Sequence, residues 1–146
     1  MTSVARLSLY SFLLFLFVAC TSVSDPYSLQ GEAYGTTWQI KFFEDQNVID
    51  KEELEIKVKE ELMRIDSIFS LYDKESSISK INKNKNLSWN NLPGNEDFQE
   101  LSKLSNEVVN NSNGSYEVFL NGEWDFNSVA KGYAVDRVCR ILELYN

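Results

Sequence analysis

The segment of the sequence with the clearest chemical potential is DFNSVAKGYAVDR, from Asp125 to Arg137. It is typical of a strand that ends in a carboxylate and turns into a helix, with Lys131 one turn inside that helix. The N–H groups at a helix start and a nearby ammonium group favour an anion, and Asp125 could accept a hydrogen bond or help to hold a cation. Gly132 would let a backbone or a ligand approach closely. A capped helix with a solvent-facing Lys131 and a packing Gly132 would show the same spacing.

The composition excludes several classes of function. The 146 residues include 14 Lys and Arg, 22 Asp and Glu and no His, which gives a net charge of −8. This acidic balance argues against nucleic-acid binding, because phosphates require a basic surface. The lack of His excludes Ser-His-Asp and Cys-His catalysis, and two Cys are too few for a four-ligand zinc site. With 43% apolar and 25% charged residues, the chain is expected to be globular.

The first twenty residues are typical of an export signal. Arg6 supplies a positive charge, and residues 7–19 are uncharged and rich in Leu and Phe. This stretch is shorter than the roughly 20 residues that span a bilayer, and it fits the apolar region of a signal peptide. The sequence FVAC, ending at Cys20, is similar to a bacterial lipoprotein box, so Cys20 is expected to carry lipid and residues 1–19 to be the signal peptide. An ordinary signal peptide or an N-terminal anchor helix is the alternative.

The chain that follows the signal is expected to consist of a tether and one domain. Residues 20–30 are polar, contain Pro26 and suit a tether, and residues 31–146 would form the domain. If Cys20 is lipidated, Cys139 is the remaining thiol, and it is expected to be a small core residue of a helix rather than a nucleophile.

Capping residues and apolar spacing predict three helices in the domain. Asp50 and Glu53 form a capping-box pattern before the first helix, Asn113-Gly114 would end the second, and Asn127 or Ser128 would cap the third. The residues expected to face the core are Leu54, Val58, Leu62, Ile65 and Phe69 in the first helix, Phe98, Leu101, Leu104 and Val108 in the second, and Ala130, Ala134, Val138, Ile141 and Tyr145 in the third.

Alternating apolar residues predict the strands. Trp38, Ile40 and Phe42 indicate a half-buried strand before the first helix, and residues 116–120 a second strand after the second helix. Asn121-Gly122 then signals a two-residue hairpin turn, with residues 123–126 as the returning strand. Residues 82–95 are polar and predict a loop. The order β-α-α-β-β-α predicts an α+β fold, with a small mixed or antiparallel sheet and helices packed on it.

Four segments, in order along the chain, resemble the motifs of one family. GEAYGTTW resembles G-x-x-M-G-T-x-x, DSIFSLYDKES with ISKIN resembles D-x-x-[FL]-S-x-Y-x-x-x-S-x-[IL]-x-x-[FLI]-N, and NGSYEV resembles G-x-[FY]-D-x-T. The segment from Asp125 resembles D-[LF]-x-x-[IV]-A-K-G-Y-A-[VA]-D. These motifs are those of the ApbE-type FAD:protein FMN transferases, and the resemblance implies that residues 31–146 form a partial ApbE-like, T-fold-related domain.

The resemblance also implies an activity and its ligands. Family enzymes bind FAD with Mg²⁺ and transfer FMN to a Thr or Ser hydroxyl of an acceptor protein, and many of them are periplasmic lipoproteins. Carried over by position, the FAD contacts would be Tyr34, Tyr72, Ser115, Tyr116, Glu117, Asp125 and Lys131, and Ser128 would contribute to the Mg²⁺ site. The three tyrosines could instead be core aromatics, and Glu117 a solvated strand residue.

The sequence departs from the family pattern in three ways. Tyr34 replaces Met and Glu117 replaces Asp. Family members are considerably longer, and the segments T-S-G-x-[YF] and H-x-I-x-D-P, which follow the A-K-G helix in them, do not occur here. No catalytic residue is therefore assigned. Two functions stay open: a lipid-anchored FMN transferase on the periplasmic side, alone or completed by another chain, and a non-catalytic periplasmic lipoprotein with residual flavin binding or a scaffold role.

Overall fold

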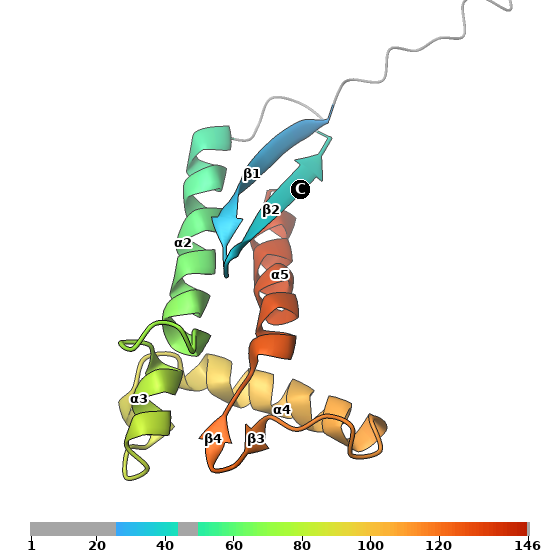
Figure 1. Ribbon diagram of the computed structural model, residues 1–146. Coiled ribbons are helices and arrows are strands. Elements are labelled where there is room, and N and C mark those ends of the chain that lie inside the picture. The colour runs from blue at the N-terminus through green and yellow to red at the C-terminus, as the bar shows by residue number, and fades with distance from the viewer. Residues whose placement is uncertain (1–25, 44–49, 146) are drawn as a thin grey trace, which may run out of the picture.

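The computed structural model describes residues 26–43 and 50–145 of the chain (Figure 1). The expected signal peptide and Cys20 lie outside the described residues. In chain order the elements are β1 (Tyr27–Ala33), β2 (Thr36–Phe42), α2 (Lys51–Phe69), α3 (Ser77–Lys83), the 3-10 turn η1 (Trp89–Asn91), α4 (Asn95–Asn111), β3 (Phe119–Leu120), β4 (Glu123–Trp124) and α5 (Asn127–Glu143). No described helix is long and apolar enough to cross a membrane.

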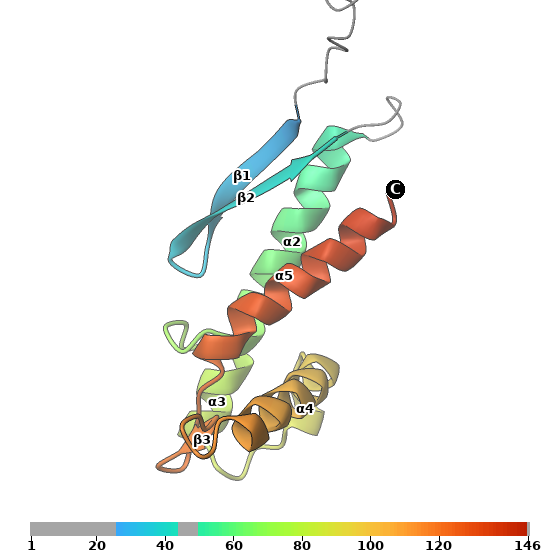
Figure 2. The same ribbon diagram turned by 90° about the vertical axis from the view of Figure 1, so that its right-hand side faces the viewer.

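The α+β fold class is confirmed, but the described strands form two separate antiparallel ribbons rather than one sheet. β1 pairs with β2, and β3 pairs with β4. The long helices α2 and α5 pack side by side and run in opposite directions, and the β1–β2 ribbon lies along this pair (Figures 1 and 2). Helix α4 crosses one end of the pair, where α3 and the β3–β4 hairpin also lie.

β1 corrects the expected extent of the tether, because residues 27–30 belong to this strand. Leu29 is buried in the core and stands opposite Ile40 of β2. Tyr34 and Gly35 join the strands with φ values of 54° and 67°, the left-handed pair that a two-residue type I′ turn requires. The residue types do not predict this turn, because Tyr has a steric cost at positive φ that Asn or Gly avoids.

Helix α2 begins and packs as predicted. The Asp50 carboxylate accepts hydrogen bonds from the N–H groups of Glu52 and Glu53, each at 3.1 Å. The five residues expected to face the core are all buried: Leu54, Val58, Leu62, Ile65 and Phe69. A side-chain cap and an apolar stripe are both local signals, which is why the sequence was sufficient here.

Helix α3 was not predicted, and its last residues replace part of the expected loop over 82–95. Ser76 caps it by accepting a hydrogen bond from the Ser79 N–H at 3.2 Å. The Ser76 hydroxyl also donates to the Ser70 carbonyl at 2.6 Å, and Ser76 is fully buried. The Ser76 side chain thus links the end of α2 to the start of α3.

The β3–β4 hairpin has the predicted turn but shorter strands. Asn121 and Gly122 have φ values of 56° and 82°, so the type I′ turn is confirmed. Tyr116 lies outside the ladder, because only two residues on each side pair as strands. The side chain of Asn82 lies against β4: its amide donates to the Trp124 carbonyl, and its carbonyl accepts the Trp124 N–H, both at 2.8 Å. Asn82 therefore pairs with β4 as a neighbouring strand would.

The expected cap of α5 is wrong. The N-cap residue is Phe126, which makes no side-chain capping bond, and not Asn127 or Ser128. The Asp125 carboxylate accepts the Asn127 N–H at 2.8 Å instead. Phe126 holds this position because its ring is fully buried, so core packing fixes the helix start one residue earlier than the polar signal suggested.

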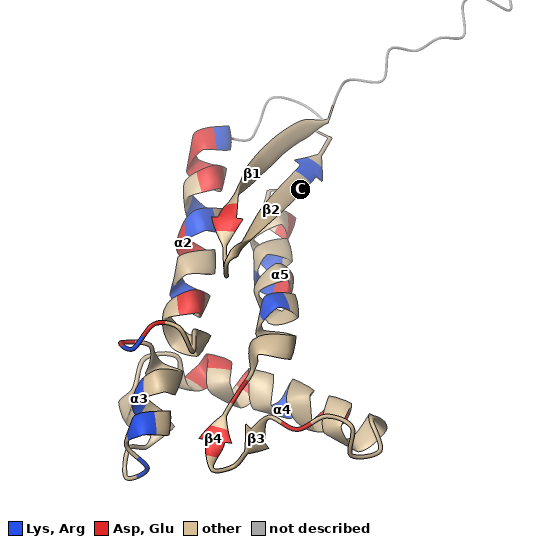
Figure 3. Ribbon diagram, viewed as in Figure 1, with Lys and Arg blue, Asp and Glu red and all other residues tan. Residues whose placement is uncertain are grey.

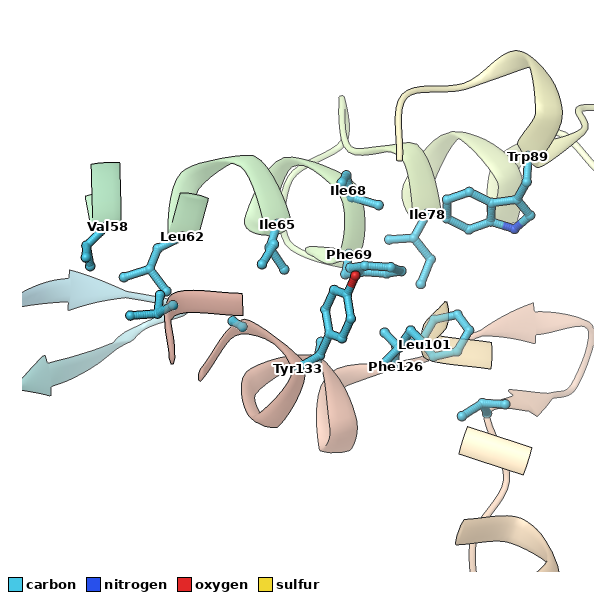
Figure 4. Close-up of a cluster of buried hydrophobic side chains, with 14 of the residues drawn as sticks. Val58, Leu62, Ile65, Ile68, Phe69, Ile78, Trp89, Leu101, Phe126 and Tyr133 are labelled. Atoms are coloured by element: carbon cyan, nitrogen blue, oxygen red, sulfur yellow. The ribbon is translucent and has the colours of Figure 1, made fainter. Parts of the chain in front are cut away.

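Aromatic rings fill the core where the helices meet (Figure 4). Phe69 contacts Phe126 edge-on, with 5.5 Å between the ring centroids, and Tyr133 at 6.4 Å. Trp89 stacks on Phe98 with 4.1 Å between the ring centroids. Since these rings come from α2, η1, α4 and α5, the cluster joins segments that are distant in the sequence.

Three residues expected in the core are exposed instead. Leu104 and Val108 of α4 are 39% and 43% exposed, because α4 runs past the end of the α2–α5 pair (Figure 1). The buried residues of α4 are Asp97, Leu101 and Ser105. Cys139 is also exposed rather than part of the core.

An ion network links α4 to α2 and α5, two helices along which charged residues are frequent (Figure 3). Arg64 of α2 makes two hydrogen bonds of 2.7 Å to the buried Asp97 of α4. The Tyr133 hydroxyl of α5 donates to the same carboxylate at 2.9 Å. Arg64 also bonds Glu61 at 2.8 Å, and Arg137 reaches Glu61 at 3.0 Å. Burial opposes the charge on Asp97, but the hydrogen bonds from Arg64 and Tyr133 outweigh it and hold the pKa of Asp97 below its usual range.

Gly94 is expected to be intolerant of a side chain. It has a φ of +82°, and a Cβ there would lie 2.5 Å from the buried Ile68 side chain. Gly94→Ala should therefore destabilise the fold by about 2–4 kcal/mol, through backbone strain and overpacking together. Gly114→Ala is the matched control, because Gly114 has a φ of +80° with nothing within 4 Å of a Cβ. It should lose only about 1 kcal/mol in chemical denaturation. Equal losses would contradict the packing argument.

Asp97→Ala should destabilise the chain by about 2–3 kcal/mol, because it leaves Arg64 and Tyr133 without their shared acceptor. Lys59→Ala breaks the exposed Lys59–Glu55 pair and should change stability by less than about 0.5 kcal/mol.

Because the pKa of Asp97 is lowered on folding, the contribution of Asp97 to the free energy of unfolding is complete at neutral pH and disappears as the pH falls through that lowered value. The unfolding free energy of the wild type should thus fall more steeply below about pH 4 than that of Asp97→Ala.

Candidate functional site

Two pockets meet at the start of α5. The first, called here the tyrosine pocket, measures about 430 Å³, and its walls include Tyr34, Asp66, Phe69, Tyr72, Asn127 and Lys131. The second, called the hairpin pocket, measures about 620 Å³, and its walls include Ser115, Tyr116, Glu117, Asp125, Asn127 and Ser128. Asn127 lines both pockets, so they form neighbouring compartments on either side of the first residue of α5.

All eight residues that the sequence singled out as ligand contacts lie on these two pockets. Tyr34, Tyr72 and Lys131 line the tyrosine pocket. The other five line the hairpin pocket: Ser115, Tyr116, Glu117, Asp125 and Ser128. They come from the β1–β2 turn, the segment after α2, the segment before β3 and the start of α5, which are separated by long stretches of chain. The fold therefore gathers the four sequence motifs at one place.

The two tyrosines of the tyrosine pocket have different surroundings. The Tyr34 hydroxyl donates to the Leu62 carbonyl of α2 at 2.8 Å, which holds its ring against that helix. Burial, together with the charges of Asp66 and Glu61, raises the pKa of Tyr34 above its usual range, so it is neutral at physiological pH. Tyr72 is 92% exposed. Tyr72 is thus not a core aromatic, whereas Tyr34 both packs against the core and forms a pocket wall.

The tyrosine pocket contains one carboxylate and one ammonium group. Lys131 is exposed on α5 and makes no ion pair with the described residues. The carboxylate of Asp66, on α2, likewise has no hydrogen-bond or ion-pair partner in the described part of the chain. Burial and the charge of Asp73 raise the pKa of Asp66 above its usual range. Sequence reasoning did not select Asp66, although it is the first residue of the D-x-x-F-S-x-Y motif.

The hairpin pocket is more polar and more open. Ser115, Glu117 and Ser128 are exposed, so Glu117 is solvated, but it precedes β3 and is not a strand residue. Tyr116 is half-buried, and its hydroxyl is buried without a hydrogen-bond partner in the described structure. Asp125 turns toward the helix start, because its carboxylate accepts the Asn127 N–H. The Asp125 carboxylate thus accepts a hydrogen bond within the protein, and its contact with a ligand stays a prediction.

Lys131, one turn into α5, is the feature of this helix start that favours an anion. Most of the N–H donors at the helix start are occupied, because Asn127 donates to the Asp125 carboxylate and both Val129 and Ala130 donate to the Phe126 carbonyl. The close approach expected at Gly132 is not observed, as nothing lies within 4 Å of a Cβ placed there. The space beside Gly132 is open.

The oxygen donors of the hairpin pocket do not make a metal site on their own. No group of three or more acidic or cysteine side chains among the described residues could hold a metal ion. Asp125 and Ser128 are nevertheless donors of the kind that Mg²⁺ prefers. Since Mg²⁺ is often held by one or two protein oxygens together with substrate phosphates and water, these residues fit a shared site but not an independent one.

Other motif residues support the pockets without lining them. Ser76 fixes the turn that carries Tyr72, through its bond to the Ser70 carbonyl. Asn82 holds β4 directly before Asp125. Their spacing in the sequence indicated a motif, but their roles depend on backbone groups that only the fold brings near.

Comparison with known proteins identifies the family and the fold of this chain. The family model described as the ApbE family matches residues 34–124. The fold is similar to that of the flavin transferase ApbE from Vibrio cholerae in its H257G mutant form, with a TM-score of 0.70, 16% identity, and 82% of this chain and 57% of that chain covered. It is also similar to the flavinyl transferase ApbE of Pseudomonas stutzeri in its apo form, with a TM-score of 0.67, 19% identity, and 82% and 55% covered. No curated protein sequence gave a significant match.

The family match and the structural likeness each cover part of the chain. At 16% and 19% identity the structural likeness concerns the fold, and this chain spans little more than half the length of those two structures. The family match ends at Trp124, so the segment from Asp125 lies beyond it. Tyr34, Tyr72 and the residues 115–117 lie within it. Because the match covers more than half of the 146 residues, the chain belongs to the ApbE family.

Proposed function

We propose that this chain is a flavin transferase of the ApbE family that binds FAD across the tyrosine and hairpin pockets. The observation that carries the proposal is that the eight motif positions, drawn from four segments, line two pockets that share Asn127. FAD has two ring systems joined by a diphosphate. Two compartments with aromatic walls, on either side of the start of a helix that carries Lys131, suit a ligand of that form.

The reaction proposed is transfer of FMN to a protein hydroxyl. The oxygen of a Thr or Ser in the acceptor protein attacks the phosphorus of the FMN half. A new P–O bond forms, the bond between the two phosphates breaks, and AMP leaves with the electron pair while the hydroxyl proton passes to a base or to solvent. Charge grows on the leaving phosphate, so positive groups near it accelerate the step.

The described residues supply part of what this reaction needs. Lys131 is available to offset phosphate charge, since it has no ion-pair partner in the described part of the chain. The exposed Tyr72 ring and the Tyr116 ring offer faces for stacking. Ser128 and Asp125 would hold Mg²⁺ together with phosphate oxygens, and the bound ion would supply charge neutralisation at the diphosphate.

We further propose that the protein acts on the periplasmic side of a bacterial membrane. The signal-like residues 1–19 and the FVAC sequence ending at Cys20 support export and lipidation. A short polar stretch before β1 would then separate the lipid from the domain. The flavin acceptor would be a protein reached at the same membrane surface.

A second candidate function is a non-catalytic lipoprotein that retains the flavin-binding surface. The lack of a self-sufficient metal site among the described residues favours it. The two candidates differ in one property, since only the transferase releases AMP and leaves FMN bound covalently to an acceptor protein.

FAD binding tests the part that both candidates share. The full chain, purified in detergent, should quench flavin fluorescence in a saturable way during titration, and Mg²⁺ should lower the Kd because it neutralises the diphosphate. Release of AMP in the presence of an acceptor protein would then identify the transferase. A folded chain that shows no saturable binding would exclude both candidates in their flavin-binding form.

Lys131→Ala should weaken FAD binding about tenfold, because one charge-assisted contact to phosphate is lost. Its thermal midpoint should stay close to that of the wild type, since Lys131 is exposed and has no partner in the described structure. Lys103→Ala removes an equally exposed Lys from α4, away from both pockets, and should leave the Kd unchanged. Parallel loss of binding and of thermal stability in Lys131→Ala would instead indicate a packing role.

A further inference from the structure

We propose that Asp66 is the residue that recognises a ring system of the ligand in the tyrosine pocket, by accepting a hydrogen bond from a ring N–H donor. This inference rests on the proposed function, because it assigns a role within the same site. Asp66 is not among the residues that the family motifs suggested as ligand contacts.

Asp66 lies on the walls of two pockets. It lies one turn before the end of α2, on the wall shared by the tyrosine pocket and a smaller pocket of about 280 Å³ behind Tyr34. Tyr34 and Phe69 line the tyrosine pocket beside it, and Lys131 lines that pocket from α5. The carboxylate is therefore placed where a ligand between the two helices would meet it.

Asp66 differs from two nearby acids, Glu61 and Asp97, which both have charged partners. Glu61, on the same helix, bonds Arg64 and Arg137, and Asp97 bonds Arg64 and Tyr133. Asp66 has no such partner in the described part of the chain, although it is partly withdrawn from water. A carboxylate in this state opposes folding, because burial favours its neutral form and no donor compensates for the lost hydration.

The walls of the pocket indicate the chemistry of the group that would compensate. The aromatic rings of Tyr34, Phe69 and Tyr72 favour a planar ring, and the carboxylate requires an N–H donor on its edge. Lys131 favours a phosphate attached to that ring system. A planar nitrogen heterocycle with an N–H donor and a linked phosphate meets all three conditions. Both the adenine amino group and the isoalloxazine imide of FAD have this chemistry.

Asp66→Ala in the full chain tests the assignment, with Glu60→Ala as the control. Glu60 is an exposed acid of the same helix that lines neither pocket, so both variants remove one negative charge and add one Ala to α2. FAD, FMN and ADP are titrated separately, and the thermal midpoint of each apo protein is measured. Asp66→Ala should weaken FAD binding about tenfold or more, and should weaken either FMN or ADP by a similar factor, which identifies the ring.

The thermal midpoint separates ligand recognition from a structural role. Removal of an unpaired, partly buried carboxylate should leave the apo Asp66→Ala protein at least as stable as Glu60→Ala. Wild-type affinity for FAD in Asp66→Ala, or a binding loss that is matched by a lower midpoint than that of Glu60→Ala, would overturn the assignment. If the wild-type chain does not bind FAD, the proposed function fails and this assignment fails with it. If the wild type binds FAD and Asp66→Ala binds it equally well, only the assignment of Asp66 fails.

Discussion

The bond between Arg64 and the buried Asp97, completed by the Tyr133 hydroxyl, is the interaction on which the position of the site depends. It joins α2, α4 and α5 at one carboxylate. Arg64 lies two residues before Asp66, and Tyr133 lies two residues after Lys131. The bonds that join Arg64 and Tyr133 at Asp97 therefore also help to set how the tyrosine pocket is bounded by α2 and α5.

Three carboxylates near the α2–α5 pair, Glu61, Asp97 and Asp66, differ in their effects on stability. Arg64 hydrogen bonds lower the pKa of Glu61, and those from Arg64 and Tyr133 outweigh burial to lower the pKa of Asp97, so both stabilise the fold at neutral pH. Burial raises the pKa of Asp66, so its charge opposes folding above that raised value. Of these three acids, Glu61 and Asp97 have partners and stabilise the fold, whereas Asp66 has no side-chain partner among the described residues and lies on a pocket. This contrast is typical of sites where binding is gained at the expense of stability.

The family motifs combine two kinds of residue that the sequence pattern cannot separate. Ser76 and Asn82 satisfy backbone groups and hold the turn after α2 and strand β4. Tyr72 and Lys131 are exposed on a pocket and contribute nothing evident to packing. Both kinds recur at fixed spacing because both depend on the same backbone geometry. Burial and hydrogen-bond partners decide which residue belongs to which kind.

The sequence by itself determined the features that depend on near neighbours: the Asp50 cap, the buried face of α2 and the Asn121-Gly122 turn. Each rests on contacts within a few residues, so spacing is enough to specify it. Tertiary structure decided the rest. It made the Tyr34-Gly35 turn tolerable by bonding the Tyr34 hydroxyl to α2, and it began α5 at the buried Phe126. It also left the Asp66 carboxylate without a partner among the residues that the structure describes. These outcomes depend on which distant segments pack together, and local pattern carries no information about that.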